Sequence, residues 1–411
     1  MKSRFNLQFF LDLITLLLVF ATFFSIPFFS FNSRLYIITW ILTGLMVVSM
    51  SISLIFISRI KIDIISFSFI LFAISSLISS ALSQFTAFKI TAPVLSFLSF
   101  VIYSYCKSNS HQKKKIYIAI YLGDVLFALA FAIMYRKEII GLDFSRLGSY
   151  FGDINDVSLF MGVGFLFSFY YIFFSKKIIL KIINVFFCIL FLICGITTGS
   201  KIFIFSLVAI YISVIFLFFG KKKWWLSSII VVCSFVLAFF ALQLPALQTV
   251  RRRLLLFFNT VIGYQTTEYI GYDLSTISRL DMFLDGIEMF MRKPLFGWGI
   301  WGFATYGGMN NGWSHNHFSE TLCNFGIIGT VLFHIGFFKS FIHYFKSKRK
   351  DNHLPFLIIV FFVVLMFSVA LNSEKIYSYL APVAFCSLCE QEKSRTFFLF
   401  AKGGTRENKN S

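Results

Sequence analysis

Long apolar runs recur along the whole chain and restrict what it can fold into. The chain has 411 residues, of which 58% are hydrophobic and 13% are charged, whereas about 25% are charged in an average soluble domain. Runs of about 18 or more apolar residues can cross the hydrocarbon core of a bilayer as helices. Because a segment in lipid must satisfy its own backbone hydrogen bonds, such runs predict helices. We therefore expect an all-α polytopic membrane protein.

These runs predict about twelve transmembrane helices. The fourth is weakened by Lys89 and Pro93, and the twelfth is short enough to be a re-entrant segment. The first is too long for the apolar region of a signal peptide, and no small-residue cleavage site follows it. The expected spans are residues 9–29, 36–58, 62–82, 86–105, 116–135, 157–175, 178–196, 202–219, 224–245, 318–345, 354–372 and 376–390.

Lysine and arginine concentrate in alternate loops between these spans, which sets the expected orientation. With the N-terminus in the cytoplasm, the basic clusters at residues 113–115, 221–223 and 348–350 fall in cytoplasmic loops, as the positive-inside rule requires. An even number of spans then places both termini in the cytoplasm, with residues 391–411 as a basic tail. The net charge of +19 is therefore a topology signal beside anionic headgroups, and nucleic acid is not an expected partner.

One segment between spans, residues 246–317, is expected on the external side and is too long to be a bare connector. Within it, residues from about 275 to 293 predict an amphipathic helix, because apolar and charged residues each recur at three- and four-residue spacing. Pro294 ends this helix, and the glycines that follow predict a turn. The apolar stripe consists of Ile277, Leu280, Leu284, Ile287 and Met291, and the charged face of Asp281, Asp285, Glu288 and Arg292.

A polar sequence stands at the mouth of the tenth expected span. Residues 314–320 read Ser-His-Asn-His-Phe-Ser-Glu, and polar groups beside lipid are costly enough to be functional candidates. His315 lies just outside the span and can titrate near neutral pH, so it can act as a general base toward a hydroxyl group. His317 is interpreted as supportive or structural. Glu320 either orients a histidine or favours the positive end of the helix.

Positive residues in the external segments oppose the usual charge bias and so need a reason. Arg279 lies near the start of the predicted external helix, and Lys201 lies in a tight Thr-Thr-Gly-Ser-Lys turn between two spans. Cationic side chains grouped at a membrane surface suit phosphate, which predicts a site for a lipid-linked pyrophosphate. The run from Arg251 to Arg253 either joins this site or anchors the segment to lipid headgroups.

No metal or other cofactor is expected. His315, His317 and Glu320 are close in sequence, but their spacing gives weak support for zinc without a further carboxylate or cysteine cluster. No pair of external aspartates has the spacing that holds Mg2+ with a sugar nucleotide. The seven cysteines are scattered and lie mostly inside spans, so they are interpreted as small core residues.

Four sequence blocks follow one another in the order typical of a known family. They are Gly-Asp-Ile-Asn-Asp at residues 152–156, Thr-Gly-Ser-Lys at 198–201, Ser278-Arg279 with the exit Pro-Leu-Phe-Gly-Trp-Gly at 294–299, and His315-Asn316 followed by Gly326 and Gly329. Together they resemble the O-antigen ligase/polymerase superfamily of bacterial envelope glycosyltransferases, over about half the chain. In the first block, Asn155 or Asp156 is also a good helix N-cap. In the last block, Gly326 and Gly329 are interpreted as packing contacts between helices and not as catalytic residues.

The resemblance implies a helical C-type glycosyltransferase that transfers glycan from undecaprenyl pyrophosphate without a metal. His315 would be the catalytic base, and Lys201 and Arg279 would bind the pyrophosphate. Apart from the resemblance, we expect Asn155, Asn316, His317 and Glu320 to complete the substrate site. The chain departs from the family pattern at two positions. Lys201 replaces an arginine, which keeps the charge and loses the bidentate fork, and Phe283 stands where ligases often carry leucine.

We expect a polymerase that joins lipid-linked repeat units of O-antigen or capsular polysaccharide. The alternative is the ligase that moves the finished chain to lipid A-core. A flippase or transporter would favour two homologous halves, whereas here the polar motifs gather in one external segment. The expected location is the bacterial inner membrane, with the active site facing the periplasm. The implied partners are the bilayer, the undecaprenyl-pyrophosphate-linked glycan, and the chain-length regulator and flippase of the same pathway.

Overall fold

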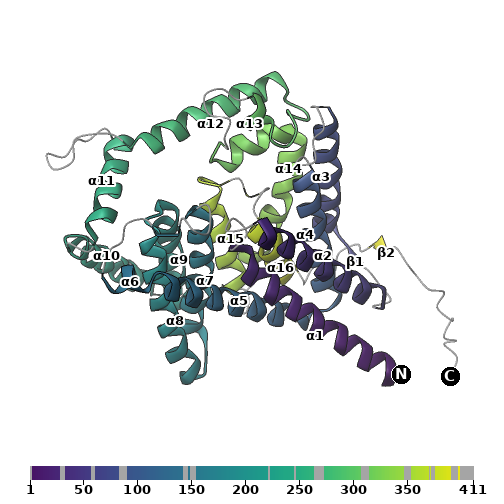
Figure 1. Ribbon diagram of the computed structural model, residues 1–411, viewed down its shortest axis with the longest axis horizontal. Helices are drawn as coiled ribbons and strands as arrows, with labels where there is room; N and C mark the ends of the chain where they lie inside the picture. Colours follow the sequence, from purple (N-terminus) through teal and green to yellow (C-terminus); the bar gives the residue numbers. More distant parts are fainter. Residues whose placement is uncertain are drawn as a thin grey trace.

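The computed structural model describes residues 2–27, 33–56, 61–82, 90–141, 147–148, 154–220, 223–244, 247–262, 273–306, 314–346, 353–369, 371, 375–389 and 397–398. Nearly all of them are helical (Figure 1), which confirms the expected all-α polytopic membrane protein. The helices are α1 (Lys2–Ser25), α2 (Ser33–Phe56), α3 (Ile64–Ala81), α4 (Thr91–Ser108), α5 (Gln112–Met134), α6 (Arg136–Ile140), α7 (Ile154–Phe174), α8 (Ile178–Thr197), α9 (Lys201–Phe219), α10 (Trp224–Ala241), α11 (Gln248–Ile262), α12 (Leu274–Arg292), α13 (Gly302–Tyr306), α14 (His317–Lys346), α15 (His353–Leu365) and α16 (Lys375–Cys389).

Two short strands, β1 (Lys61–Ile62) and β2 (Phe397–Phe398), were not expected from the sequence. They pair antiparallel, with Ile62 opposite Phe397. Strand β2 belongs to the expected tail at residues 391–411, the rest of which lies outside the described residues.

Every expected span overlaps a helix, namely α1–α5, α7–α10 and α14–α16. Eight of these are long and apolar enough to cross a membrane: α1, α2, α3, α5, α7, α8, α9 and α14. The helices α10, α15 and α16 are apolar but shorter. Helix α4, the weakened fourth span, carries Pro93 in its first turn, where proline breaks no helical hydrogen bond. The described residues thus support eight spans by length and composition, and the full number of twelve stays a prediction.

Phenylalanine packed against glycine joins the central helices. Helix α7 lies against α8 and α9, and α3 lies against α4 and α14. A Cβ added to Gly164 of α7 would lie 2.1 Å from the ring of Phe191 of α8, and one added to Gly195 would lie 2.1 Å from Phe203. Small residues allow this close approach, and van der Waals contact then holds helices together in lipid. Many apolar side chains on α8 and α10 stay exposed, among them Ile182 at 65%, as lipid-facing surfaces require.

Two acidic side chains fasten the helices near the start of α3 and the end of α4. Asp63 caps α3 by accepting hydrogen bonds from the amides of Ile65 and Ser66, and it forms an ion pair with Lys107 of α4. Asp12 of α1 accepts hydrogen bonds from Tyr105 and Gln112, each over 2.6 Å. An unpaired charge is costly inside an apolar bundle. The ion pair of Asp63 and the hydrogen bonds to Asp12 reduce that cost.

A break divides α14. Gly326 has φ +64° and ψ −168°, so the helix is interrupted there. The expected span at residues 318–345 therefore corresponds to α14, which is long and apolar enough to cross a membrane and has this break inside it. This backbone conformation favours glycine. A Cβ at Gly326 would also lie 2.3 Å from the carbonyl oxygen of Leu295, so the backbone of the turn after α12 occupies the space beside the break.

That turn, at residues 294–299, supplies the hydrogen-bond partners that α14 loses. The amide of Ile327 donates to the carbonyl of Pro294, and the amide of Trp298 donates to the carbonyl of Cys323, each over 2.8 Å. From α3, the hydroxyl of Ser79 donates to the carbonyl of Asn324 over 2.7 Å. The break in α14 is therefore a joint in which the external segment and two membrane helices meet.

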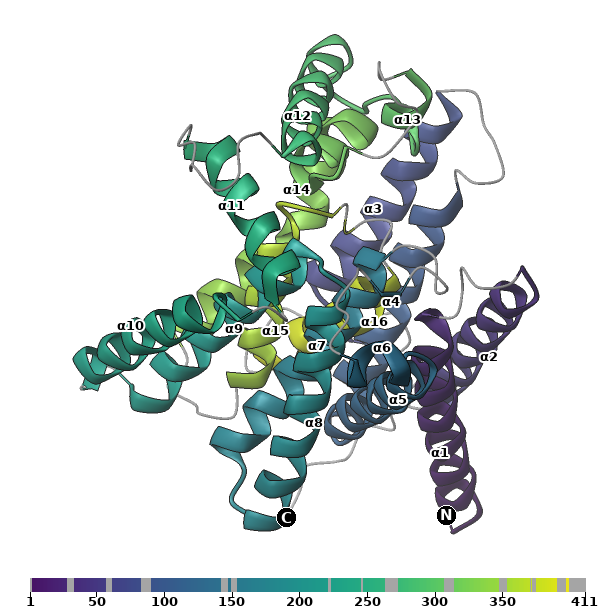
Figure 2. The ribbon, with the colours of Figure 1, turned by 60° about the vertical axis from the view of Figure 1, so that its left-hand side comes forward.

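The segment between α10 and α14 holds α11, α12 and α13, of which only α12 was expected. Figures 1 and 2 show these helices on one side of the bundle, with α12 reaching the start of α14. The packing face of α12 holds Gly286 and Met289, which are buried, whereas Leu280 and Leu284 of the expected apolar stripe are 60% and 56% exposed. A Cβ at Gly286 would lie 2.9 Å from that of Ser319, and Met289 packs against Cys323, so α12 contacts α14 through these residues, with Leu280 and Leu284 left exposed.

Candidate active site

Three cationic side chains from three helices line one cavity of about 90 Å3. Lys201 is the first residue of α9, Arg253 comes from α11, and Arg279 comes from α12. Asn155 of α7 and Ser275 of α12 also line it. The structure therefore brings together three residues expected in the substrate site, Asn155, Lys201 and Arg279, although they are far apart in the sequence.

The tight turn before α9 fixes the position of Lys201. Its hydroxyl groups bind back to α8, because Thr197 donates to the carbonyl of Cys194 and Thr198 to that of Gly195. Gly199 has φ +60°, a conformation that a tight turn needs and glycine adopts without strain. The chain can then reverse within a few residues, and α9 begins at the cavity.

Asn155 is held against the same turn. Its side-chain oxygen accepts a hydrogen bond from the hydroxyl of Ser200 over 3.1 Å, and Ser158 donates to Ser200 over 3.1 Å. Helix α7 begins at Ile154, so Asn155 lies inside its first turn and is not the N-cap. The preceding part of that sequence block, residues 151–153, lies outside the described residues.

Arg253 is the member of the Arg251–Arg253 run that faces the cavity. Its guanidinium donates to the carbonyl of Gly199, whereas Arg252 is exposed. Successive residues on a helix point about 100° apart, so the three arginines cannot share one direction. From the sequence, this run could either bind phosphate or anchor the segment to lipid headgroups. The choice depended on helix α11, which was not predicted.

The ammonium group of Lys201 is surrounded by the start of α12. It forms an ion pair with Asp273 and donates hydrogen bonds to the hydroxyls of Ser275 and Thr276 over 3.0 and 3.2 Å. Burial raises the pKa of Asp273, but hydrogen bonds from Lys201, Thr276 and Ser275 outweigh it and hold that pKa below its usual value. The carboxylate is therefore ionised at neutral pH, and sequence reasoning missed it.

The backbone at His315 is held in an uncommon conformation. His315 is half-buried and has φ +52°, a left-handed value that is rare outside glycine. The amide of Ser314 donates to Glu320 over 2.8 Å, and the Ser314 hydroxyl donates to the carbonyl of Asn316 over 2.9 Å. Local strain of this kind often accompanies functional sites.

Asn316 and Glu320 organise the start of α14. The side-chain oxygen of Asn316 accepts hydrogen bonds from the amides of Phe318 and Ser319 over 3.0 and 3.2 Å, which makes it an N-cap. Glu320 is fully buried, and its second oxygen accepts a hydrogen bond from Asn324 over 2.9 Å. Glu320 thus fixes the backbone before His315. Its two expected roles, orienting a histidine or favouring the positive end of the helix, stay predictions.

His317 lies inside the protein. Its side chain is fully buried, and its ring lies 4.5 Å from that of Phe333, centroid to centroid. Its Nδ1 accepts a hydrogen bond from the amide of Leu371 over 3.2 Å, so the proton of the neutral ring is on Nε2. These contacts tie the start of α14 to the segment after α15.

The expected site residues thus form two clusters. Asn155, Lys201 and Arg279 line the cation cavity, whereas the residues that line it do not include His315, Asn316, His317 or Glu320. Helix α12 connects the clusters. Its Gly286 packs against Ser319, and Arg279 lies two turns away, or about 10 Å along the helix axis.

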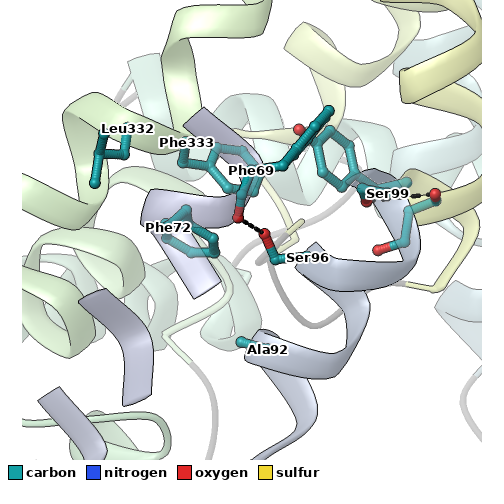
Figure 3. Close-up of a pocket in the computed structure, with 9 residues that line it drawn as sticks. Phe69, Phe72, Ala92, Ser96, Ser99, Leu332 and Phe333 are labelled. Atoms are coloured by element: carbon teal, nitrogen blue, oxygen red, sulfur yellow. Dashed lines mark hydrogen bonds between the residues drawn. The ribbon is translucent and has the colours of Figure 1, made fainter. Parts of the chain in front are cut away.

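A second cavity lies among α3, α4, α14 and α16, as Figure 3 shows. Its walls include Phe69, Phe72 and Phe333, and it encloses about 10 Å3. The hydroxyl of Ser96 donates to the carbonyl of Phe69 over 2.7 Å, so it is already satisfied. This cavity is too small and too apolar for a sugar or a phosphate.

Within the described residues, no group of three or more histidine, cysteine or acidic side chains is arranged to hold a metal ion. The cationic groups that line the other cavity carry positive charge and donate hydrogen bonds. Both properties suit an anion.

Comparison with known families bears directly on this cavity. Residues 186–334 match the family model described as O-antigen ligase. This match supports the O-antigen ligase/polymerase superfamily for that part of the chain. Members of this superfamily are enzymes that act on lipid-linked glycans. The match contains Lys201, Arg253, Arg279 and His315, whereas Asn155 lies outside it and joins the site only through the fold. A search of curated proteins found no match.

Proposed function

We propose that this protein is a glycosyltransferase that polymerises undecaprenyl-pyrophosphate-linked repeat units of O-antigen or capsular polysaccharide. The observation that carries the proposal is the cavity lined by Lys201, Arg253 and Arg279. Two guanidinium groups and an ammonium group suit a diphosphate, because each arginine can bind two phosphate oxygens at once. Arg253 supplies the second fork, which is missing at Lys201.

The chemistry requires a base for the acceptor and cations for the leaving group. An acceptor hydroxyl attacks the anomeric carbon while His315 takes its proton. The bond from that carbon to the phosphate oxygen breaks, and its electron pair leaves with undecaprenyl pyrophosphate. Cations fixed beside the diphosphate stabilise the charge that develops there. The strained backbone at His315, held by Ser314 and Glu320, supports a functional role for that loop.

The proposed location is the periplasmic face of the inner membrane. Under the positive-inside rule, Asn155, Lys201, Arg253 and Arg279 all belong to external segments. Their meeting in one cavity supports this assignment, because residues from opposite faces of the bilayer could not share a site.

The direct test is turnover by the purified full-length protein in nanodiscs, with EDTA present. The substrate is a synthetic repeat unit on undecaprenyl pyrophosphate. We expect products of two or more units and released undecaprenyl pyrophosphate. Absence of both products from a folded preparation, with lipid-linked units of the producing strain as donor and acceptor, would contradict the proposal.

A second candidate function is the ligase reaction, in which the acceptor is lipid A-core. The description of the matched family as O-antigen ligase favours it. Deletion of a polymerase leaves lipid A-core with a single repeat unit or stops capsule extension. Deletion of a ligase leaves lipid A-core bare and long chains on undecaprenyl pyrophosphate. Gels of surface glycan from a deletion strain therefore decide between the two reactions.

A further inference from the structure

Asp273 is the acidic partner of a cation that the proposed function assigns to phosphate. It precedes the first residue of α12 and forms an ion pair with Lys201. Its carboxylate also accepts hydrogen bonds from the hydroxyls of Ser275, over 2.8 Å, and Thr276. These donors surround the carboxylate with one ammonium and two hydroxyl groups at the N-terminus of a helix.

The same donor set suits a phosphate group. Helix N-termini, lysine and hydroxyl side chains are the usual ligands of phosphate oxygens. Lys201 and Ser275 line the cation cavity, so the donors that hold the Asp273 carboxylate lie at the edge of the space assigned to the diphosphate. A carboxylate and a phosphate in contact with the same lysine would repel each other, since like charges at close range are costly.

We propose that Asp273 occupies a phosphate subsite of the cavity and is displaced from it when the donor diphosphate binds. This inference rests on the proposed function. It assigns Asp273 a positioning role, since the carboxylate acts by holding or releasing Lys201.

The exchange has consequences for both binding and release. While Asp273 holds Lys201, the cavity attracts the diphosphate with the charges of Arg253 and Arg279 alone. Breaking the glycosidic bond leaves one more negative charge on the departing diphosphate, and Lys201 is then available to it. When the ion pair between Asp273 and Lys201 forms again, the carboxylate competes with the diphosphate product for the same hydrogen-bond donors. Removing its charge should therefore tighten diphosphate binding, lower KM and slow product release.

Asp273→Asn is the suitable variant, because it removes the charge and keeps the size and shape of the side chain at the N-cap position of α12. Glu288→Gln is the matched control. It removes one negative charge from α12 itself, but Glu288 is 65% exposed and forms an ion pair with Arg292 of the same helix, away from Lys201. Arg279→Ala reports on the cavity itself. All are full-length proteins in nanodiscs of neutral lipid, so that no anionic headgroup competes.

Binding of inorganic pyrophosphate is measured by calorimetry, with folding checked by the thermal unfolding midpoint. We expect Asp273→Asn to bind on the order of tenfold more tightly, the effect of about one charged hydrogen bond. Glu288→Gln should change affinity less than about twofold, the scale of an exposed charge pair. Arg279→Ala should weaken binding.

Unchanged or weaker binding by Asp273→Asn, with weaker binding by Arg279→Ala, would overturn the inference and leave the proposed function standing. Equal gains in Asp273→Asn and Glu288→Gln would also overturn it, because the effect would then be general electrostatics. Equal binding by wild type and Arg279→Ala, or binding by none of these proteins, would overturn the diphosphate cavity and this inference with it.

Discussion

At the scale of single residues, the cation cavity combines two kinds of positive group. Arg253 and Arg279 carry planar forks that match two phosphate oxygens, whereas Lys201 is a point charge with three donors. The partners of Lys201 are Asp273, Ser275 and Thr276. The three cations therefore differ in what they can contribute, and substitutions should separate their roles.

Arg279→Ala should lower turnover of a lipid-linked donor by about 10²–10³-fold, the usual cost of losing one preorganised group that stabilises developing charge. Arg279→Lys should lose much of the activity because the fork is absent. Arg253→Ala should be impaired in the same assay, whereas its exposed neighbour Arg252→Ala should retain activity. Equal effects at the two neighbours would remove Arg253 from the diphosphate site.

His315→Ala should lower turnover by about 10²–10⁴-fold, the usual worth of a positioned base, without a change in expression. His317→Ala should act on stability, because the side chain is fully buried and accepts a hydrogen bond from Leu371. Its turnover per folded molecule should stay closer to wild type. The two effects are separated by measuring turnover and the unfolding midpoint on the same preparations. Normal turnover in His315→Ala beside a folded but inactive His317→Ala would assign the base to the other histidine.

At the scale of elements, the break in α14 and the turn at residues 294–299 form one unit. Backbone groups that a continuous helix would pair internally are paired here with the turn, so neither part can change alone. The unit also fixes α12, which carries Arg279 and docks through Gly286 on Ser319. Geometry at the cavity therefore depends on a joint that contains no charged residue of the site.

Two glycines with similar backbone angles allow this joint to be tested. Gly326 has φ +64° and Gly220 has φ +67°. A Cβ at Gly326 meets the carbonyl oxygen of Leu295 at 2.3 Å, whereas no atom of the described residues lies within 4 Å of a Cβ at Gly220. Gly220→Ala should cost about 1–2 kcal/mol from backbone strain alone. Gly326→Ala should cost about 3 kcal/mol or more, because a steric clash is added. Chemical unfolding in detergent gives both values, and equal losses would contradict a packed joint.

At the scale of the whole molecule, the cavity must lie on one face of the membrane. A cysteine is introduced at Glu288, which is 65% exposed, after the native cysteines, including the exposed Cys233, have been replaced. We expect it to react with an impermeant maleimide in cells whose outer membrane is permeable to the reagent. A cysteine at Lys177, in the loop before α8, should react only after lysis of the inner membrane. The reverse pattern would invert the orientation and contradict a periplasmic active site.

The sequence alone was enough to predict the helical membrane fold, the helix at residues 275–293 and the family. These features depend on local pattern, because lipid requires each span to be apolar and to satisfy its own hydrogen bonds. Asn155, Lys201 and Arg279 could be selected as candidates because polar and cationic groups are unusual in such surroundings. The sequence also indicated the family through four blocks, because short sequence motifs can be recognised without knowledge of the three-dimensional structure.

Only the tertiary structure decided which of these residues meet. It assigned Arg253, and not Arg252, to the cavity because the direction of each arginine depends on how α11 is rotated about its axis. It paired Lys201 with Asp273, which no spacing in the sequence connects. It broke α14 at Gly326, since a helix gives up its internal hydrogen bonds only where another backbone replaces them. Contacts between distant segments depend on the three-dimensional packing of the helices, and that information is absent from any single stretch of sequence.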